Sequence, residues 1–121
     1  MNKLSDQKTW HWPVALGQAE HNAINAIRSH LANILSLDAK EISKTTVVRW
    51  AMKRTVECIK SDMAMLKKVA ANAIARGDKE PWSFYRLEAD TIMLEKIKKA
   101  YELAFDSQAF RFALLLQKEL L

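Results

Sequence analysis

Cysteine, glycine and proline are all scarce in this chain of 121 residues. It has one cysteine, Cys58, and two residues each of glycine and proline. A single cysteine excludes a disulfide within the chain, and with it a small secreted fold held together by disulfides. Such low glycine and proline contents argue against many strands and tight turns, because tight turns depend on these residues. We therefore predict long helices.

Long apolar runs are also missing. No run approaches the roughly 18 apolar residues that a membrane-spanning helix needs. Residues 1–7 lack the apolar stretch of a signal peptide. We therefore expect a cytoplasmic protein without a membrane partner. Half of the residues are hydrophobic and 27% are charged, so the chain can bury a core.

Groups that could carry catalysis are few. The only histidines are His11, His21 and His30, and none has a cysteine or second histidine at metal-ligand spacing. The two glycines, Gly17 and Gly77, cannot form a phosphate-binding loop. We expect no metal, no cofactor and no enzymatic activity, so the protein should act by binding a partner.

The net charge of +5 is concentrated in the middle of the chain. Residues 41–79 contain nine lysines and arginines against four acidic residues, which is a local charge of +5. A concentrated basic region suits a polyanionic partner such as DNA. The alternative interpretation is an ordinary solvent-exposed helix face that is rich in lysine.

Residue periodicity predicts a mainly α fold with four helices and one short N-terminal strand. Apolar and polar residues alternate over 8–16, which is typical of a strand. Apolar spacing predicts a helix over 18–37, and Ser43 is a good N-cap for a second helix that would end at Gly77. Pro81 suits the start of a third helix, and residues 108–120 form a fourth. No internal repeat is apparent.

Two features of these helices suggest contacts between chains. Apolar residues at 48–73 form a heptad-like seam, which predicts a homodimer. Arg49, Lys53, Lys60 and Lys67 lie off this seam and would form a basic stripe. Residues 108–120 are too apolar for a free surface helix and should pack deep inside or bind a protein partner. We accordingly divide the chain into a DNA-binding region, 1–77, and a C-terminal packing or oligomerisation region, 78–121.

The segment 42–51 (ISKTTVVRWA) carries the clearest motif. Hydroxyl residues, two aliphatic residues, Arg49, any residue and Ala51 follow one another. This pattern resembles the second helix of the ribbon-helix-helix repressor family over residues 8–60. The resemblance implies an intertwined dimer whose paired strands enter the DNA major groove. It implies base contacts from Thr9 and His11, and phosphate contacts from Ser43, Lys44 and Thr45. It also implies that Val47, Val48 and Ala51 pack in the dimer core.

The same segment is also similar to the recognition helix of a helix-turn-helix, in which Lys44, Thr45 and Arg49 would face the groove. Both resemblances predict a small DNA-binding regulator, either a transcriptional repressor or an accessory protein of a mobile element. The residues expected to contact nucleic acid are Thr9, His11, Ser43, Lys44, Thr45, Arg49, Lys53 and Lys60. The alternative is a helical protein–protein interaction module whose basic face binds an acidic partner.

Overall fold

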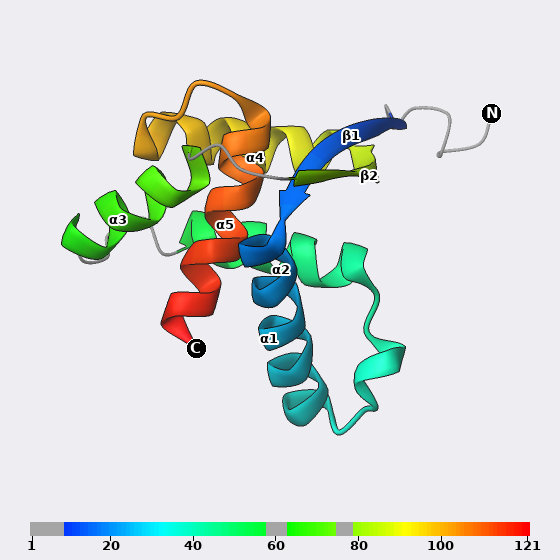
Figure 1. Cartoon of the computed structure of the whole chain (residues 1–121). Coiled ribbons are helices and arrows are strands. Elements are labelled where there is room, and N and C mark those ends of the chain that lie inside the picture. Colours follow the sequence, from blue (N-terminus) through cyan, green and yellow to red (C-terminus); the bar gives the residue numbers. More distant parts are fainter. Residues whose placement is uncertain (1–8, 58–62, 75–78) are drawn as a thin grey trace.

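The chain is mainly helical, as the sequence predicts, and it also contains one two-stranded antiparallel sheet (Figure 1). The computed structural model describes residues 9–57, 63–74 and 79–121. The elements run in the order β1 (Thr9–Gly17), α1 (Gln18–Leu35), the short 3-10 helix η2 (Ala39–Glu41), α2 (Lys44–Glu57), α3 (Met63–Ile74), β2 (Lys79–Leu87), α4 (Glu88–Tyr101) and α5 (Asp106–Leu120).

The predicted strand is present as β1, and its partner is β2, which the sequence interpretation missed. We expected Pro81 to begin a helix, but it lies inside β2. The residues that follow it, Trp82, Phe84 and Tyr85, favour strands. Each strand of a two-stranded ribbon has a free edge where a proline is tolerated, so Pro13 and Pro81 are both accommodated.

The single long helix expected from Ser43 to Gly77 is wrong in its extent. Two helices, α2 and α3, occupy this part of the chain, and residues 58–62 between them lie outside the described residues, as does Gly77. The start of α2 was predicted correctly. The hydroxyl of Ser43 accepts a hydrogen bond from the Thr46 amide at 3.1 Å, which is the geometry of an N-cap.

Two consecutive units of the chain share one plan, so an internal repeat exists that we did not detect in the sequence. Each unit is a strand followed by two helices: β1, α1 and α2 in the first, and β2, α4 and α5 in the second. The strands have nine residues each and pair along their whole length, with Thr9 opposite Leu87 and Gly17 opposite Lys79. The first helices α1 and α4 both end at left-handed residues, Ser36 and Glu102.

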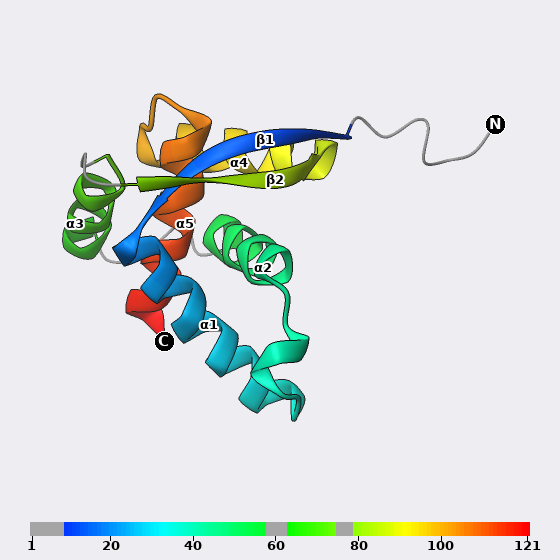
Figure 2. The ribbon, with the colours of Figure 1, turned by 45° about the vertical axis from the view of Figure 1, so that its right-hand side comes forward.

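The two units are interlocked and related by an approximate twofold axis that passes between Pro13 and Ser83 at the centre of the ribbon. Packing is crosswise, since α1 contacts α5 and α2 contacts α4. The second helices α2 and α5 also pack against each other, and the Gln117 amide donates to the Thr55 hydroxyl at 3.1 Å between them. Figure 2 shows the ribbon lying across the helices that it joins.

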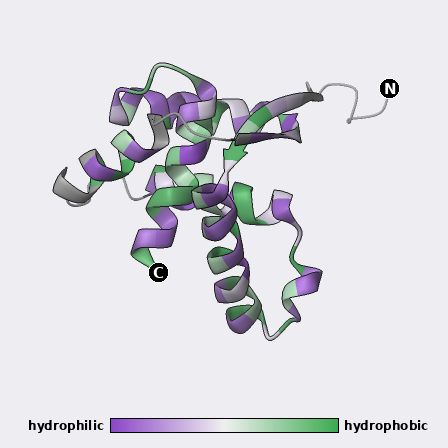
Figure 3. Cartoon of the chain, in the orientation of Figure 1, coloured by the Kyte–Doolittle hydropathy of each residue, from purple (hydrophilic) through white to green (hydrophobic). Residues whose placement is uncertain are grey.

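One hydrophobic core is built from every strand and α-helix of the described chain. Helix α5 lies at its centre and contacts α1, α2, α3 and α4. Its residues 109–117 are all buried, which confirms that this apolar segment packs deep inside (Figure 3). Within the described ranges, no helix is both long and apolar enough to span a bilayer.

This burial changes the interpretation of the apolar seam. Val48, Met52, Leu66 and Val69 belong to the core of a single chain. A second copy of the chain is therefore not needed to explain their apolar spacing. The homodimer remains a prediction, but this seam no longer supports it. The same holds for a protein partner at 108–121, where only residues 118–121 are exposed. The expected boundary at residue 77 falls between the two units, which share one core.

The central position of α5 leads to a prediction about two leucines in the same helix. Leu114 is fully buried, whereas Leu120 is 41% exposed. Leu114→Ala should lower the free energy of unfolding by about 2–5 kcal/mol because it leaves a cavity in the core. Leu120→Ala should change it by less than about 1 kcal/mol. Urea denaturation of both variants measures the difference, and equal losses would contradict the position assigned to α5.

Candidate nucleic-acid interface

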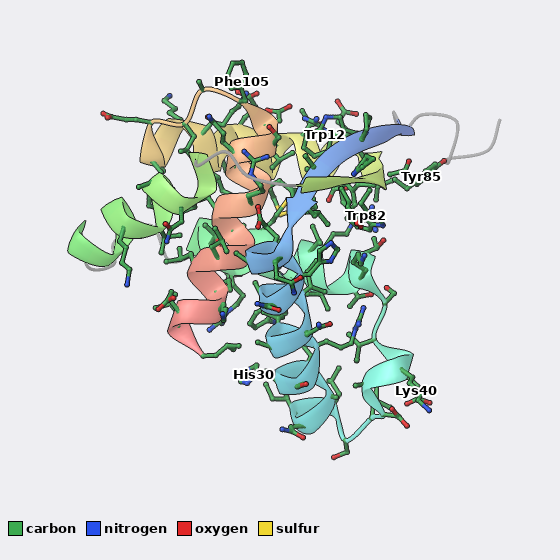
Figure 4. All side chains as sticks on the ribbon, in the orientation of Figure 1. Trp12, His30, Lys40, Trp82, Tyr85 and Phe105 are labelled. Atoms are coloured by element: carbon green, nitrogen blue, oxygen red, sulfur yellow. The ribbon has the colours of Figure 1, made fainter. Side chains whose placement is uncertain are left out.

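The ribbon presents one face to the helices and the other to solvent. Val14 and Phe84 point inward and are buried, while Pro13, Ser83 and Tyr85 lie on the opposite face and are exposed. This alternation follows from the two-residue period of a strand. Figure 4 shows the Tyr85 side chain pointing away from the helices. The DNA major groove is wide enough to admit a two-stranded ribbon of this kind.

Aromatic side chains hold the inner face of the ribbon on α5. The ring of Phe110 lies 5.4 Å from the ring of Phe84 and 5.6 Å from the ring of Trp12, both centroid to centroid and both edge to face. The Trp82 ring lies 5.5 Å from that of Phe84. Such contacts add to the stabilisation that burial alone provides. Trp12 and Trp82 therefore pack against the core. Any partner of the ribbon would meet the residues of its outer face.

The start of α2 lies beside Trp82, near the middle of β2, and the start of α5 lies beside Trp12 of β1; we call these places the α2 end and the α5 end. The Lys44 ammonium lies 5.2 Å from the centre of the Trp82 ring, a cation–π contact. Ser43 is exposed and caps the helix, and Thr45 is half-buried beside Lys44. A lysine, two hydroxyls and the positive end of the helix dipole thus lie next to β2. Together they form an environment that favours an anion.

The corresponding end at α5 is different, because its first residue is Asp106. Arg86 Nη2 and Lys98 Nζ each lie 2.7 Å from an oxygen of the Asp106 carboxylate. Partial burial opposes ionisation of Asp106, but the hydrogen bonds from Lys98 and Arg86 outweigh it and lower the pKa of the carboxyl. Hydrogen bonds that Lys98 donates to Asp106 and Glu95 in turn raise the pKa of Lys98. The charges at this end are therefore already paired within the protein.

A shallow pocket also marks the α5 end. It has a volume of about 420 Å³ and is lined by Trp12, Pro13, Lys98, Ala104, Phe105, Asp106 and Ser107. Phe105 precedes α5 at the position that Ser43 holds before α2, and its side chain is 65% exposed. Figure 4 shows it projecting from the surface of the molecule. A hydroxyl cap at one end thus corresponds to an exposed aromatic ring at the other.

Two buried acid–arginine pairs link the units crosswise. Asp90 in the first turn of α4 is 1% exposed and accepts hydrogen bonds from Arg49 of α2 at 3.1–3.3 Å. Glu20 in the first turn of α1 is 2% exposed and lies 3.6 Å from Arg111 of α5. Burial lowers the pKa of Arg111, while the charge of Glu20 opposes the shift. Arginine is protonated at any physiological pH, so Arg111 remains charged despite this shift.

Arg49 also fixes the ribbon. Its Nη2 donates to the backbone carbonyl of Tyr85 at 2.8 Å and to Asp90 at 3.1 Å, and its guanidinium lies 5.3 Å from the Phe84 ring centre. We predicted that Arg49 would face DNA as part of a basic stripe. The side chain is instead one-third exposed and bound to α4 and β2. Its charge is therefore already neutralised, and it positions Tyr85.

The other residues predicted to contact nucleic acid are only partly brought together. Ser43, Lys44 and Thr45 lie at the start of α2, and Lys53 is exposed further along this helix. Thr9 and His11 lie in β1, where their backbones pair with Leu87 and Tyr85, but their side chains lie outside the described part. Lys60 lies outside the described residues, as does the side chain of Lys67.

Ser83 and Tyr85 were missed, because β2 was interpreted as the start of a helix. The repeat itself could have revealed them. Arg49-Trp50-Ala51 in α2 corresponds to Arg111-Phe112-Ala113 in α5. Trp12 and Glu20 of the first unit likewise correspond to Trp82 and Asp90 of the second. A search for a second copy of the motif would have placed a strand before α4.

No protein-family model, no curated protein and no solved structure matches this chain. Across the described ranges, no group of three or more histidine, cysteine, aspartate or glutamate side chains could hold a metal ion.

The buried acid of α4 generates a stability prediction. Asp90→Ala removes the partner of Arg49 and an acceptor for the Leu87 amide, which is bonded at 2.8 Å. We expect the free energy of unfolding to fall by about 2–4 kcal/mol, towards the lower end for a broken buried pair because Arg49 can regain some water. Glu88→Ala, an exposed acid of the same helical turn, should cost less than about 1 kcal/mol. Chemical denaturation decides between them, and equal costs would exclude a structural role for the pair.

The ion pairs of Asp106 predict a pH effect. Because the pKa of Asp106 is lowered in the folded state, its stabilising contribution is present above the ordinary aspartate range and is lost as pH falls through the lowered value. At pH 7, Asp106→Asn should reduce stability by about 1–3 kcal/mol. The gap between the native protein and the variant should narrow below about pH 4. Thermal melts from pH 7 to pH 2 test this, and a gap that is independent of pH would rule out the pairing.

Proposed function

We propose that this protein is a small DNA-binding regulator that inserts the β1–β2 ribbon into the major groove of duplex DNA. The observation that carries the proposal is the pair of interlocked strand–helix–helix units, joined through an antiparallel ribbon whose outer face is exposed. This arrangement resembles a ribbon-helix-helix dimer, with both units supplied by one chain. A role as a transcriptional repressor or as an accessory protein of a mobile element fits such a binder.

The groove chemistry supports this docking mode. Two-stranded ribbons enter the major groove and read base edges with the residues of their outer face. Ser83 and Tyr85 supply hydroxyl groups on that face, and Pro13 and Ala15 keep its centre low enough for close approach. Arg49 acts as a positioning residue, since it holds the Tyr85 carbonyl. In this proposal, Arg49 does not contact DNA directly.

Phosphate contacts would come from the α2 side. Ser43, Lys44 and Thr45 lie beside the ribbon, and Lys53 adds an exposed charge along the same helix. These groups suit a phosphate flanking the groove. The second unit completes the ribbon, so one chain should suffice for binding.

An interaction module for proteins is the second candidate, favoured by an exposed apolar group at the end of α1. Ile34, Leu35 and Leu37 are 62%, 54% and 45% exposed. Clustered apolar residues of this size often mark a protein contact. This candidate predicts DNA binding that is weak and independent of the ribbon.

A salt titration with mixed-sequence duplex DNA tests the proposal. The logarithm of the binding constant should fall by about 0.9 per phosphate contact for each unit in the logarithm of salt concentration. Lys44→Ala should weaken binding and reduce this slope by about one. Lys118→Ala is the matched control, because Lys118 is exposed near the C-terminal end of α5, far from the ribbon (Figure 1).

Three results would count against DNA binding. One is a dissociation constant weaker than about 10⁻⁴ M at physiological salt, the weak limit of ordinary non-specific binding. Another is an equal loss in the Lys44 and Lys118 variants. A third is full binding by a Tyr85→Glu variant, because a carboxylate on the outer face would repel the phosphate backbone if the ribbon entered the groove.

A further inference from the structure

The two halves of the ribbon are built alike but carry different chemistry on the outer face. The approximate twofold axis matches Pro13 with Ser83, and Ala15 with Tyr85. At every matched position, one strand has a side chain that can form a hydrogen bond and the other has none. The backbone of the ribbon therefore has approximate twofold symmetry, whereas the side chains on its outer face do not.

The α2 end and the α5 end also carry different groups at matched positions. Lys44 lies over the Trp82 ring at the α2 end. At the α5 end, the ring of the matching residue Trp12 is covered instead by the Arg86 guanidinium, 4.8 Å away, and Arg86 is itself bound to Asp106. A phosphate at the α2 end would meet a lysine. A phosphate at the α5 end would meet a carboxylate whose neighbouring cations are already bound.

A dimer of identical chains cannot differ in this way. Its two halves present the same residues, and so its DNA sites are palindromic or nearly so. Here each half is encoded separately. The acids Glu20 and Asp90 with their arginines are matched, and so are Trp12 and Trp82, which both pack on Phe110. The outer positions of the ribbon, which would meet DNA, are not matched.

We propose that the chain binds duplex DNA in a single orientation and recognises a site without twofold symmetry, with Tyr85 reading a base in one half-site and Ser83 reading a base at the centre. This inference rests on the proposed function and specifies its substrate. The two hydroxyls can each donate and accept a hydrogen bond, and so either can read a base edge. Arg49 donates a hydrogen bond to the backbone carbonyl of Tyr85, which fixes the point from which the Tyr85 side chain extends. The paired charges at the α5 end leave that side without a phosphate contact of the kind that Lys44 offers.

Selection of binding sites from a pool of duplexes with a random central segment tests the inference on the full chain. We expect an enriched sequence whose two halves are not inverted copies of each other. Two symmetrised duplexes, each built from one half and its inverted copy, should then bind at least about fivefold more weakly than the selected duplex. This is the smallest loss that a mismatched base contact normally causes.

Single substitutions assign the reading to β2. Tyr85→Phe and Ser83→Ala each remove one hydroxyl and should relax base preference about fivefold to a hundredfold. Tyr85→Phe should do so in one half-site only, and Ser83→Ala at the centre of the site. Pro13→Ala, at the position matched to Ser83, is the control and should leave the preferences of both halves unchanged. Circular dichroism melts establish that all three variants are folded.

The outcomes separate this inference from the proposed function. A palindromic selected sequence, or a symmetrised duplex that binds as tightly as the selected one, overturns the single orientation while DNA binding stands. Binding without any enriched sequence overturns base reading. Absence of duplex binding by the folded chain removes the proposed function and this inference together.

Discussion

The pairing of β1 with β2 is the constraint on which the rest of this structure depends. A two-stranded ribbon is marginally stable by itself in water and requires a covered face. The strands are far apart in sequence, so their pairing closes a long loop at an entropic cost. The helices offset that cost by packing crosswise beneath the ribbon. Each first helix follows directly from its strand, so the ribbon also sets where α1 and α4 begin.

The buried charges make this arrangement specific. Asp90 and Glu20 both lie in the first turn of a helix, where a negative charge is favoured, and each meets an arginine from the other unit. A displaced helix would leave a buried carboxylate without its partner, which is far more costly than a lost apolar contact. Apolar packing provides most of the stability, and these pairs select one way of packing the two units.

Because one chain encodes both units separately, the two units can carry different residues on their surfaces. Several positions that hold the units together keep their chemistry: the two acids with their arginines, and Trp12 and Trp82 on the inner face. Positions that face solvent have diverged, with Lys44 at one end and Asp106 at the other. Arg49 shows how burial decides the role of a residue. A cation expected at a DNA surface is bound by Asp90 and instead supports the strand that carries Tyr85.

The sequence by itself determined the helical class, the strand at 8–16, the cap at Ser43 and the buried character of the last helix, because these depend on local periodicity and local hydrogen bonding. Only the tertiary structure decided that residues 79–87 form a strand. Pro81 reads equally well as a helix start, and the residues after it become a strand because β1 offers hydrogen bonds and Phe110 offers a surface to cover. The repeat was present in the sequence as Arg-x-Ala in α2 and α5, a short signal that only a deliberate search for a second copy of the motif would have found. Which cations face solvent was also decided by tertiary contacts, since the partners of Arg49, Arg86 and Lys98 are brought to them by packing between elements or across a turn of the chain.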